Sequence, residues 1–132
     1  MRFVQTLSVP AGKTEALPAE QAVRLIGGTL KHIEIAFPPG PGSHVSVVIM
    51  DRNLQIAPIN PEASFAWDDY TMSFSMNYPL DDAPYELLLR GWSPEAVFAH
   101  TITFRFDVEP AEEDDRSAIL DYLKQLVGMP QR

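Results

Sequence analysis

The chain contains few residues of the types that carry out chemistry, and none of them forms a known catalytic motif. Its three histidines, His32, His44 and His100, lie in or beside different runs of alternating apolar residues. None has an acid or a second histidine at metal-ligand spacing with a third ligand nearby. Cysteine is absent, so thiol nucleophiles, thiolate zinc sites and disulfides are excluded. We therefore predict no catalytic residue, no metal ligand and no cofactor.

Serine and glycine patterns lead to the same expectation. No serine stands in the G-x-S-x-G elbow of the hydrolases. Phosphate-binding loops and dinucleotide-binding fingerprints are absent as well. The pair Gly27-Gly28 is interpreted as a turn between two strands. The protein is therefore predicted not to be an enzyme.

Two acidic pairs, Asp68-Asp69 and Asp81-Asp82, lie in predicted turns. Calcium binds several oxygens from one or two loops, so the two pairs together could supply a calcium site. Two carboxylates could also flank a glycosidic bond. Neither pair has the D-x-D-x-D-G spacing of a calcium loop, and aspartate is a favoured turn residue. We interpret both pairs as turn residues and keep calcium binding and glycoside hydrolysis as alternatives.

Aromatic residues are the remaining candidates for a binding site. Trp67 and Tyr70 bracket the first Asp pair, and Trp92 begins the segment "WSPEA". Exposed tryptophan and tyrosine can stack on sugars or anchor a protein interface. Trp67 is expected to close one end of the core, with an exposed binding role as the alternative. For Trp92 the buried and the exposed interpretation stay equally open.

Composition and charge narrow the class of protein. A chain of 132 residues with 45% hydrophobic and 21% charged residues is typical of one globular domain. A formal net charge of −8 argues against a nucleic-acid partner, because phosphate binding needs a basic surface. The N-terminus alternates and has no long apolar core, so we expect no signal peptide. No apolar run is long enough for a membrane span, so no membrane partner is expected.

Alternating apolar residues predict an all-β protein, an antiparallel β-sandwich of the immunoglobulin-like or jelly-roll type with seven or eight strands. The predicted strands cover 3–9, 23–26, 30–37, 45–49, 54–57, 71–76, 85–90 and 100–106. In the third of them, Lys31 is placed on the same face as Ile33. The predicted core contains Ile33, Ile35, Phe37, Val45, Val47, Ile49, Phe74, Leu87, Ile102, Phe104 and Phe106.

Two segments between the strands have a distinct character. Residues 10–21 are polar, contain two prolines and are interpreted as an extended arm or long loop. The corner "PPGPG" at 38–42 lacks amide donors at its prolines, so it cannot extend a β-ladder or recruit a stray strand. It is interpreted as a rigid connection, with a contact loop for a partner as the alternative. The predicted domain covers 1–110 and includes the arm.

The C-terminal part, 111–132, is predicted to hold one helix and a tail. Acids precede a helical pattern at 116–127, Gly128 ends it and Pro130 follows. An apolar stripe contains Ile119, Tyr122, Leu123 and Leu126. A helix this short is marginal alone, so we expect it to dock on its own sheets or on a neighbouring subunit.

The order of these segments resembles a known group of proteins. "TLSVPAGKTEALPA", "IEIAFPPG", "QIAPINP", "WDDYTMSF" and "HTITFRF" follow one another as in small all-β virion proteins of tailed bacteriophages, of the capsid decoration or minor head and tail accessory type. The resemblance spans about residues 3–108. It implies symmetric assembly without turnover chemistry, capsid or tail proteins as partners, and a location in the virion after assembly in the host cytoplasm.

The sequence therefore predicts a non-enzymatic structural or interaction subunit of a phage particle that forms a homo-oligomer and docks on a larger lattice. The predicted interface residues are Ile119, Tyr122, Leu123, Leu126, Trp92 and Trp67. A carbohydrate-binding or adhesion module that uses exposed Trp and Tyr on the loops is the alternative function. A small enzyme with a site at an oligomer seam is the third.

Overall fold

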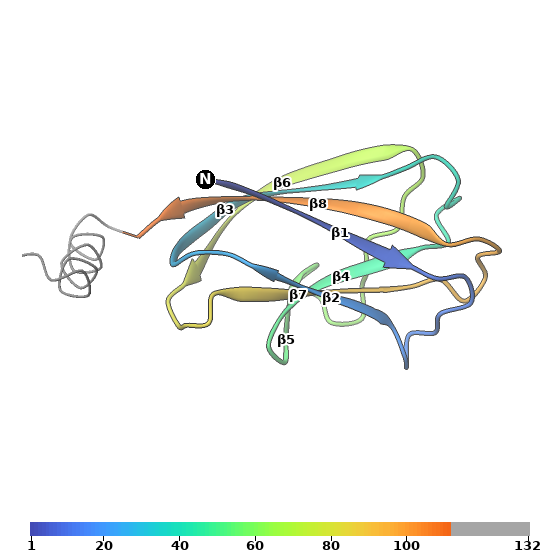
Figure 1. Ribbon diagram of the computed structural model, residues 1–132, viewed down its shortest axis with the longest axis horizontal. Helices are drawn as coiled ribbons and strands as arrows, with labels where there is room; N and C mark the ends of the chain where they lie inside the picture. Colours follow the sequence, from blue (N-terminus) through green and yellow to red (C-terminus); the bar gives the residue numbers. More distant parts are fainter. Residues whose placement is uncertain (112–132) are drawn as a thin grey trace, which may run out of the picture.

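The computed structural model describes residues 1–111, which form eight β-strands in two antiparallel sheets (Figure 1). The strands are β1 (Arg2–Val9), β2 (Ala19–Arg24), β3 (Gly28–Phe37), β4 (Ser46–Asp51), β5 (Leu54–Ala57), β6 (Tyr70–Leu80), β7 (Glu86–Trp92) and β8 (His100–Pro110). No helix occurs within residues 1–111. The predicted all-β antiparallel fold is confirmed, whereas the predicted helix at 116–127 lies outside the described residues.

The strands pair as if a long hairpin had been folded over on itself. Sheet A has the order β1-β8-β3-β6 and sheet B the order β2-β7-β4-β5. The first strand therefore pairs with the last, the second with the seventh, the third with the sixth and the fourth with the fifth. The two sheets form the upper and lower layers of Figure 1.

The core lies between the sheets and is built from the inward faces of both. Strand β8 illustrates the pattern, because Ile102, Phe104 and Phe106 are fully buried while Thr101 is exposed and Thr103 is only partly covered. The predicted core residues are all buried except Phe74, which is partly exposed and packs against the cluster. The two-residue period of the sequence therefore identified the core correctly.

One inward assignment was wrong because β3 contains an irregularity that alternation does not reveal. The pairing of β3 with both neighbours shifts register between Leu30 and His32. Lys31 is the extra residue relative to β8, whereas β6 has Met76 and Asn77 opposite it. Lys31 is exposed, and Leu30 takes the fully buried inward position. The Lys31 ammonium instead donates to Asn77 Oδ1 at 2.6 Å. A bulge places two successive side chains outside and thereby reverses the faces beyond it.

The predicted arm is a folded part of the domain. Strand β2 begins at Ala19, inside the predicted arm, and ends at Arg24 instead of continuing to residue 26. The preceding loop is held by Ser93, whose side chain is fully buried and donates to the Pro10 carbonyl at 3.0 Å. Backbone bonds join Gly12 N to Ser93 O at 3.0 Å and Ser93 N to Lys13 O at 2.9 Å. Residues 10–13 are therefore fixed to the β7–β8 loop.

The antiparallel arrangement sorts the connections to two ends of the molecule. Loops 10–18, 38–45, 58–69 and 93–99 lie together at one end, which we call the loop end, on the right of Figure 1. The turns 25–27, 52–53 and 81–85 lie at the opposite end with Met1 and Ala111. The four longer loops at the loop end are where a binding site would be assembled.

Candidate functional site

The proline corner 38–42 is held at the loop end by an acid from another loop. One carboxylate oxygen of Asp68, Oδ1, accepts hydrogen bonds from Gly40 N at 2.9 Å and Gly42 N at 2.8 Å. Gly40 has φ +121° and Gly42 φ +58°, conformations that favour glycine. The corner is closed further by His44 N, which donates to Pro41 O at 2.9 Å. The predicted rigid connection is therefore clamped by Asp68, whose carboxylate accepts hydrogen bonds from two backbone amides of the corner.

Next to this clamp, Trp67 and Tyr70 form an exposed aromatic pair. Their ring centroids are 5.1 Å apart and the planes are tilted by 45°. Trp67 is 47% exposed and Tyr70 is 51% exposed. The sequence analysis expected Trp67 to close one end of the core, and this expectation is wrong. The alternative, an exposed aromatic side chain, is what the structure has. An exposed pair of rings leaves apolar surface in water that a ligand could cover.

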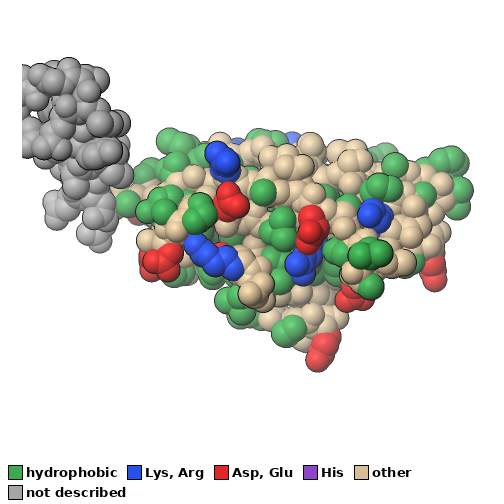
Figure 2. Space-filling model, turned by 60° about the horizontal axis from the view of Figure 1, so that its bottom comes forward, with side chains coloured by type: hydrophobic (Ala, Val, Ile, Leu, Met, Phe, Trp, Pro, Cys, Tyr) green, Lys and Arg blue, Asp and Glu red, His purple; other side chains and the backbone are tan. Residues whose placement is uncertain are grey.

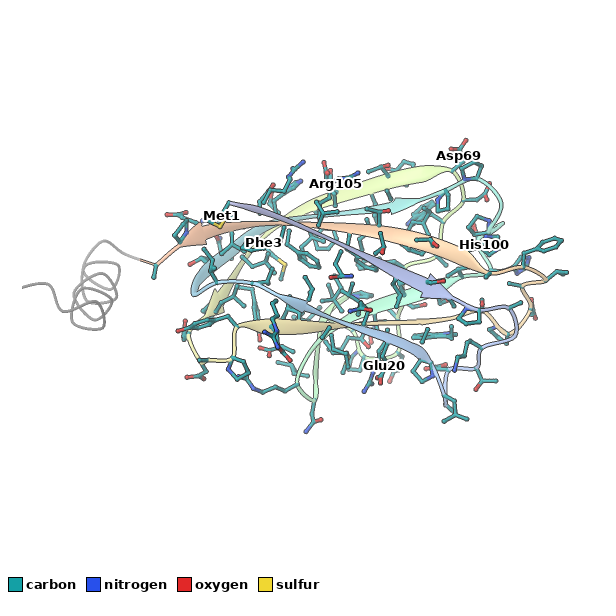
Figure 3. All side chains as sticks on the ribbon, in the orientation of Figure 1. Met1, Phe3, Glu20, Asp69, His100 and Arg105 are labelled. Carbon is teal, nitrogen blue, oxygen red and sulfur yellow. The ribbon has the colours of Figure 1, made fainter. Side chains whose placement is uncertain are left out.

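A shallow hollow of about 230 Å³ opens beside Tyr70 on the outer face of sheet A. Thr71 of β6, Ala36 of β3 and Thr103 of β8 are neighbours across the three strands and line it. The other lining residues are Phe37 at the end of β3, Pro38 and Pro39 of the corner, Asp69, Tyr70 and Thr101. Figure 3 shows Asp69 and His100 at this end of the molecule. The hollow therefore combines three threonines and a carboxylate, and Tyr70, the first residue of β6, borders it.

The residues that line the hollow suit a polar ligand without negative charge. Threonine hydroxyls donate and accept hydrogen bonds, and the Asp69 carboxylate accepts them. No Lys or Arg is among the described residues that line the hollow, so an anionic group would meet no opposite charge. An aromatic ring at the rim offers a flat apolar surface for stacking. The combination can hold a small polyhydroxylated ring but contains no nucleophile–base pair.

Two of the three histidines, His44 and His100, flank the proline corner, whereas His32 lies on sheet A. His44 Nδ1 lies 3.4 Å from Glu95 Oε2 on the next loop, and both side chains are exposed. His100 begins β8 with its ring beside Gly40, where an added Cβ would lie 3.4 Å from the ring. His32 lies on the outer face of sheet A with Nδ1 at 3.4 Å from Ser75 Oγ.

A second hollow, of about 200 Å³, lies at the opposite end and includes Asp81 and Asp82. The whole of β6 separates these residues from Asp68-Asp69. A strand of eleven residues is roughly 35 Å long. The two Asp pairs therefore cannot form one calcium site or flank one glycosidic bond. Within residues 1–111, no group of three or more His, Asp or Glu side chains is placed to hold a metal ion.

Among the tyrosines of residues 1–111, Tyr78 in the second hollow is the one whose pKa is clearly shifted. Tyr78 donates its hydroxyl to Asp51 Oδ2, and Asp51 also accepts from Arg52 Nη1 at 3.0 Å. Burial first, and then the hydrogen bond to Asp51, raise the pKa of Tyr78 from 10.0 to about 12. The phenol is therefore protonated at neutral pH and donates a hydrogen bond to Asp51.

This raised pKa predicts a loss of stability in alkali. Because the folded state binds the phenol proton more tightly than the unfolded state, the contribution is complete below pH 10 and is lost as pH rises toward 12. We expect the free energy of unfolding of the wild type to fall by roughly 1 to 2 kcal/mol more than that of Tyr78→Phe over this window, allowing for partial exposure. Urea titrations of both proteins at successive pH values measure the difference. Parallel curves would contradict the prediction.

The remaining predicted site residues are not brought to the loop-end hollow. Trp92 is the last residue of β7, pairs with Ser46 and is partly buried, so it does not begin an exposed turn. The apolar stripe residues lie outside the described residues: Ile119, Tyr122, Leu123 and Leu126. Sequence reasoning missed the threonines and considered Asp69 only as part of the Asp68-Asp69 pair. They come from separate strands and a loop, and the only available signal was the alternation that places Thr101 and Thr103 outward.

Exposed apolar side chains also gather at the loop end. Leu17 is 73%, Ile59 85%, Val97 79% and Phe98 72% exposed, and they belong to three different loops. Figure 2, viewed toward sheet B, shows hydrophobic side chains at the end of the molecule away from the grey segment. Single exposed apolar residues are common, whereas contiguous ones mark contact surfaces.

Comparisons with known proteins identify no family. No protein-family model and no curated protein matches the chain. Among solved structures, a de novo designed double-stranded β-helix is 14% identical over 81% of this chain and 99% of its own, with a TM-score of 0.35. The IMPa metallopeptidase in complex with T-antigen is 15% identical over 96% of this chain, with a TM-score of 0.33. A family two carbohydrate esterase from Cellvibrio japonicus is 12% identical over 84% of this chain, with a TM-score of 0.21.

The chain spans only 15% of the metallopeptidase and 37% of the esterase. At these TM-scores none of the three similarities carries an argument about this protein, and none of the three is a virion protein. The part of the chain that the structure describes also has no helix with the length and hydropathy of a membrane span.

Proposed function

We propose that the protein is a non-catalytic binding module that holds a neutral sugar at its loop end. The observation that carries the proposal is the Trp67–Tyr70 pair, with both rings about half exposed beside a hollow lined by threonines. A pyranose ring has an apolar face that stacks on an aromatic side chain and hydroxyls that exchange hydrogen bonds with Thr and Asp. The clamp formed by Asp68 supports this function because it holds the neighbouring corner in place before a ligand binds.

We also infer that the two sheets form a β-sandwich of the jelly-roll type, one of the two types expected from the sequence. The support is the nested pairing of first with last, second with seventh, third with sixth and fourth with fifth strands. Jelly rolls occur among lectin domains and among viral capsid proteins. This fold type is therefore compatible with sugar binding and with the virion subunit suggested by the resemblance, and the site must distinguish them.

The size and charge of the hollow define the ligand class more closely. A volume of about 230 Å³ is below the usual range for sites that enclose a drug-sized ligand. It fits one sugar ring held at the surface, such as a terminal residue of a glycan. The absence of Lys and Arg among the described lining residues favours neutral over acidic sugars.

Binding of neutral sugars is expected to weaken about two- to tenfold in Trp67→Ala and in Tyr70→Ala. Losing one stacking ring removes roughly 0.5 to 1.5 kcal/mol, and 1.4 kcal/mol corresponds to a factor of ten. The measurement is a screen of immobilised neutral and acidic glycans, followed by calorimetric titration of the sugars that bind. Trp67 and Trp92 are the two tryptophans, so Trp92→Phe leaves Trp67 as the sole fluorescence reporter of the same event.

The control is Phe98→Ala, which removes a more exposed aromatic side chain from loop 93–99, and Phe98 does not line the hollow. Its sugar affinity should equal that of the wild type. If no neutral sugar binds, or if Trp67→Ala binds as tightly as the wild type, the proposal is wrong. Thermal melting of each variant separates a lost contact from a lost fold.

An assembly subunit is the second candidate function, and the exposed Leu17, Ile59, Val97 and Phe98 favour it. Such a subunit would bind a larger protein lattice through these loops. Mass measurement of the native protein, alone and after co-expression with the products of neighbouring genes, detects such a complex. A complex that is lost in Phe98→Ala and retained in Trp67→Ala would favour assembly over sugar binding.

A further inference from the structure

Strand β6 forms one edge of sheet A, and only its β3 side is paired within residues 1–111. It is eleven residues long, from Tyr70 to Leu80, equal to the longest strand of the domain. An unpaired edge offers a row of backbone donors and acceptors to another strand. β6 is therefore the most extended free edge that the described part of the chain presents.

The other three edge strands carry features that discourage pairing, and β6 largely lacks them. β5 has only four residues, β1 begins with Arg2, and β2 contains Glu20 and Arg24. No charged residue occurs anywhere in β6, and its proline, Pro79, is the residue before last. The register of β6 with β3 is regular from Tyr70 to Ser75 and shifts beyond that point. The centre of β6 is thus an uncharged, regular edge.

The inward side chains of β6 are also incompletely covered. Met72, Phe74 and Met76 are partly exposed, whereas Ile33 and Ile35 on the neighbouring strand β3 are fully buried. The facing edge of sheet B is the four-residue β5, which is much shorter than β6. Phe65 from the preceding loop covers part of Phe74, with ring centroids 5.6 Å apart. A further strand beside β6 would cover the remaining apolar surface.

The sequence of β6 indicates which partner strand would pair with its free edge. The segment "YTMSFSMNY" at 70–78 reads nearly the same in both directions about Phe74. We propose that β6 pairs antiparallel with β6 of a second copy of this chain, about a two-fold axis at Phe74. In that register Phe74 meets Phe74, Met72 meets Met76 and Ser73 meets Ser75 of the other copy. Thr71 then lies opposite Asn77, and Tyr70 opposite Tyr78.

Every one of these pairs matches in polarity and in the face of the sheet it occupies. Apolar partners meet on the core side and hydroxyl or amide partners on the outer side. A two-fold interface requires this self-complementarity, since the same surface is used twice. No like charges oppose each other, because the strand has none. A single strand pair buries less area than a stable permanent dimer, so the association is expected to be weak and to rise with concentration.

Cysteine crosslinking tests the register, and the absence of natural cysteines makes the test clean. Ser73 and Ser75 are exposed, and Ser→Cys changes little in size. In the proposed register the two positions face each other across the axis with Cα atoms about 4.5 to 5.5 Å apart, within disulfide range. Position 73 is about 7 to 8 Å from its own copy, which is too far.

Mildly oxidised mixtures of full-length S73C and S75C are therefore expected to give several-fold more covalent dimer than either variant alone. Equal crosslinking in the mixture and in the single variants would overturn the proposed register. No dimer in any sample would overturn the pairing itself.

Charge substitutions supply an independent test by sedimentation equilibrium. In S73K/S75K the introduced lysines of one copy lie opposite those of the other, so self-association should fall at least tenfold. A 1:1 mixture with S73E/S75E should restore it, because opposite charges then face each other. The matched control is T6K/S8K, which adds the same charge to the exposed outer face of β1 at the opposite edge of sheet A. A wild type that stays monomeric up to near-millimolar concentration, or equal weakening by the control, would overturn the proposal.

Discussion

Replacing Phe104 by alanine is expected to lower the free energy of unfolding by roughly 3 to 5 kcal/mol, the usual cost of truncating a buried aromatic residue. Phe104 is fully buried in the middle of β8, where it pairs with Gln5 on one side and Ile35 on the other. Its ring lies parallel to that of Phe106 with centroids 6.4 Å apart. β8 is a central strand of sheet A, so the cavity would be enclosed on both sides and could not fill by a local shift.

Urea denaturation at neutral pH measures this change. Phe98→Ala is the control, because it deletes the same side chain at a position that is 72% exposed. We expect that variant to remain within about 0.5 kcal/mol of the wild type. A loss below about 1 kcal/mol in Phe104→Ala would be incompatible with the packing of the central strand.

Replacing Gly28 by alanine is expected to cost a similar amount, roughly 3 to 5 kcal/mol, or to prevent folding. Gly28 begins β3 and pairs with Leu80 on one side and Pro110 on the other. Its φ is +150°, and an added Cβ would lie 2.0 Å from the Glu109 carbonyl oxygen. The obstacle is backbone of the neighbouring strand, which cannot rotate away as a side chain could.

Gly12→Ala is the matched control for this prediction. Gly12 also has a positive φ, +75°, but an added Cβ there meets nothing within 4 Å. It should cost only the conformational strain, about 1 to 2 kcal/mol. Thermal melts of the two variants give the comparison. If the two variants lost the same stability, the contact between position 28 and the backbone of β8 would not be the reason why glycine is needed there.

The loop-end hollow and the β6 edge lie on the same sheet, and this has a geometric consequence if both proposals hold. A two-fold axis perpendicular to sheet A keeps the outer faces of both copies on the same side. Tyr70 and its equivalent would be eight residues apart along the paired strands, roughly 27 Å. The dimer would therefore present two hollows to one surface, and weak binding of single sugars would be strengthened on a surface that carries many of them.

The sequence by itself determined the features that depend on neighbours along the chain. Alternation of apolar residues has a period of two only in strands, so Ile102, Phe104 and Phe106 could be assigned to the core without a structure. The same pattern separated the strands and predicted an all-β antiparallel domain. The uncharged palindrome about Phe74 is likewise a property of the sequence alone, although its meaning depends on β6 lying at an edge.

Tertiary structure decided the features that depend on residues distant in the chain. Asp68 read as an ordinary turn residue, because its partners Gly40 and Gly42 lie in another loop. Trp67 resembled a core residue by composition, and only the position of its loop beyond the end of the sheets left it half exposed. The bulge at Lys31 reversed a face that alternation had assigned, since a bulge is defined by the pairing of neighbouring strands and not by residue type.

The hollow itself is the clearest case of this division. Thr71, Ala36 and Thr103 are separated by more than thirty positions in sequence and become neighbours only because β6, β3 and β8 pair in one register. Strand order is set by the packing of whole faces and by the paths of the loops, and these long-range terms leave no local signature. Local periodicity therefore specifies which side of each strand faces the core, whereas only the assembled sheets specify which outward side chains meet to form a site.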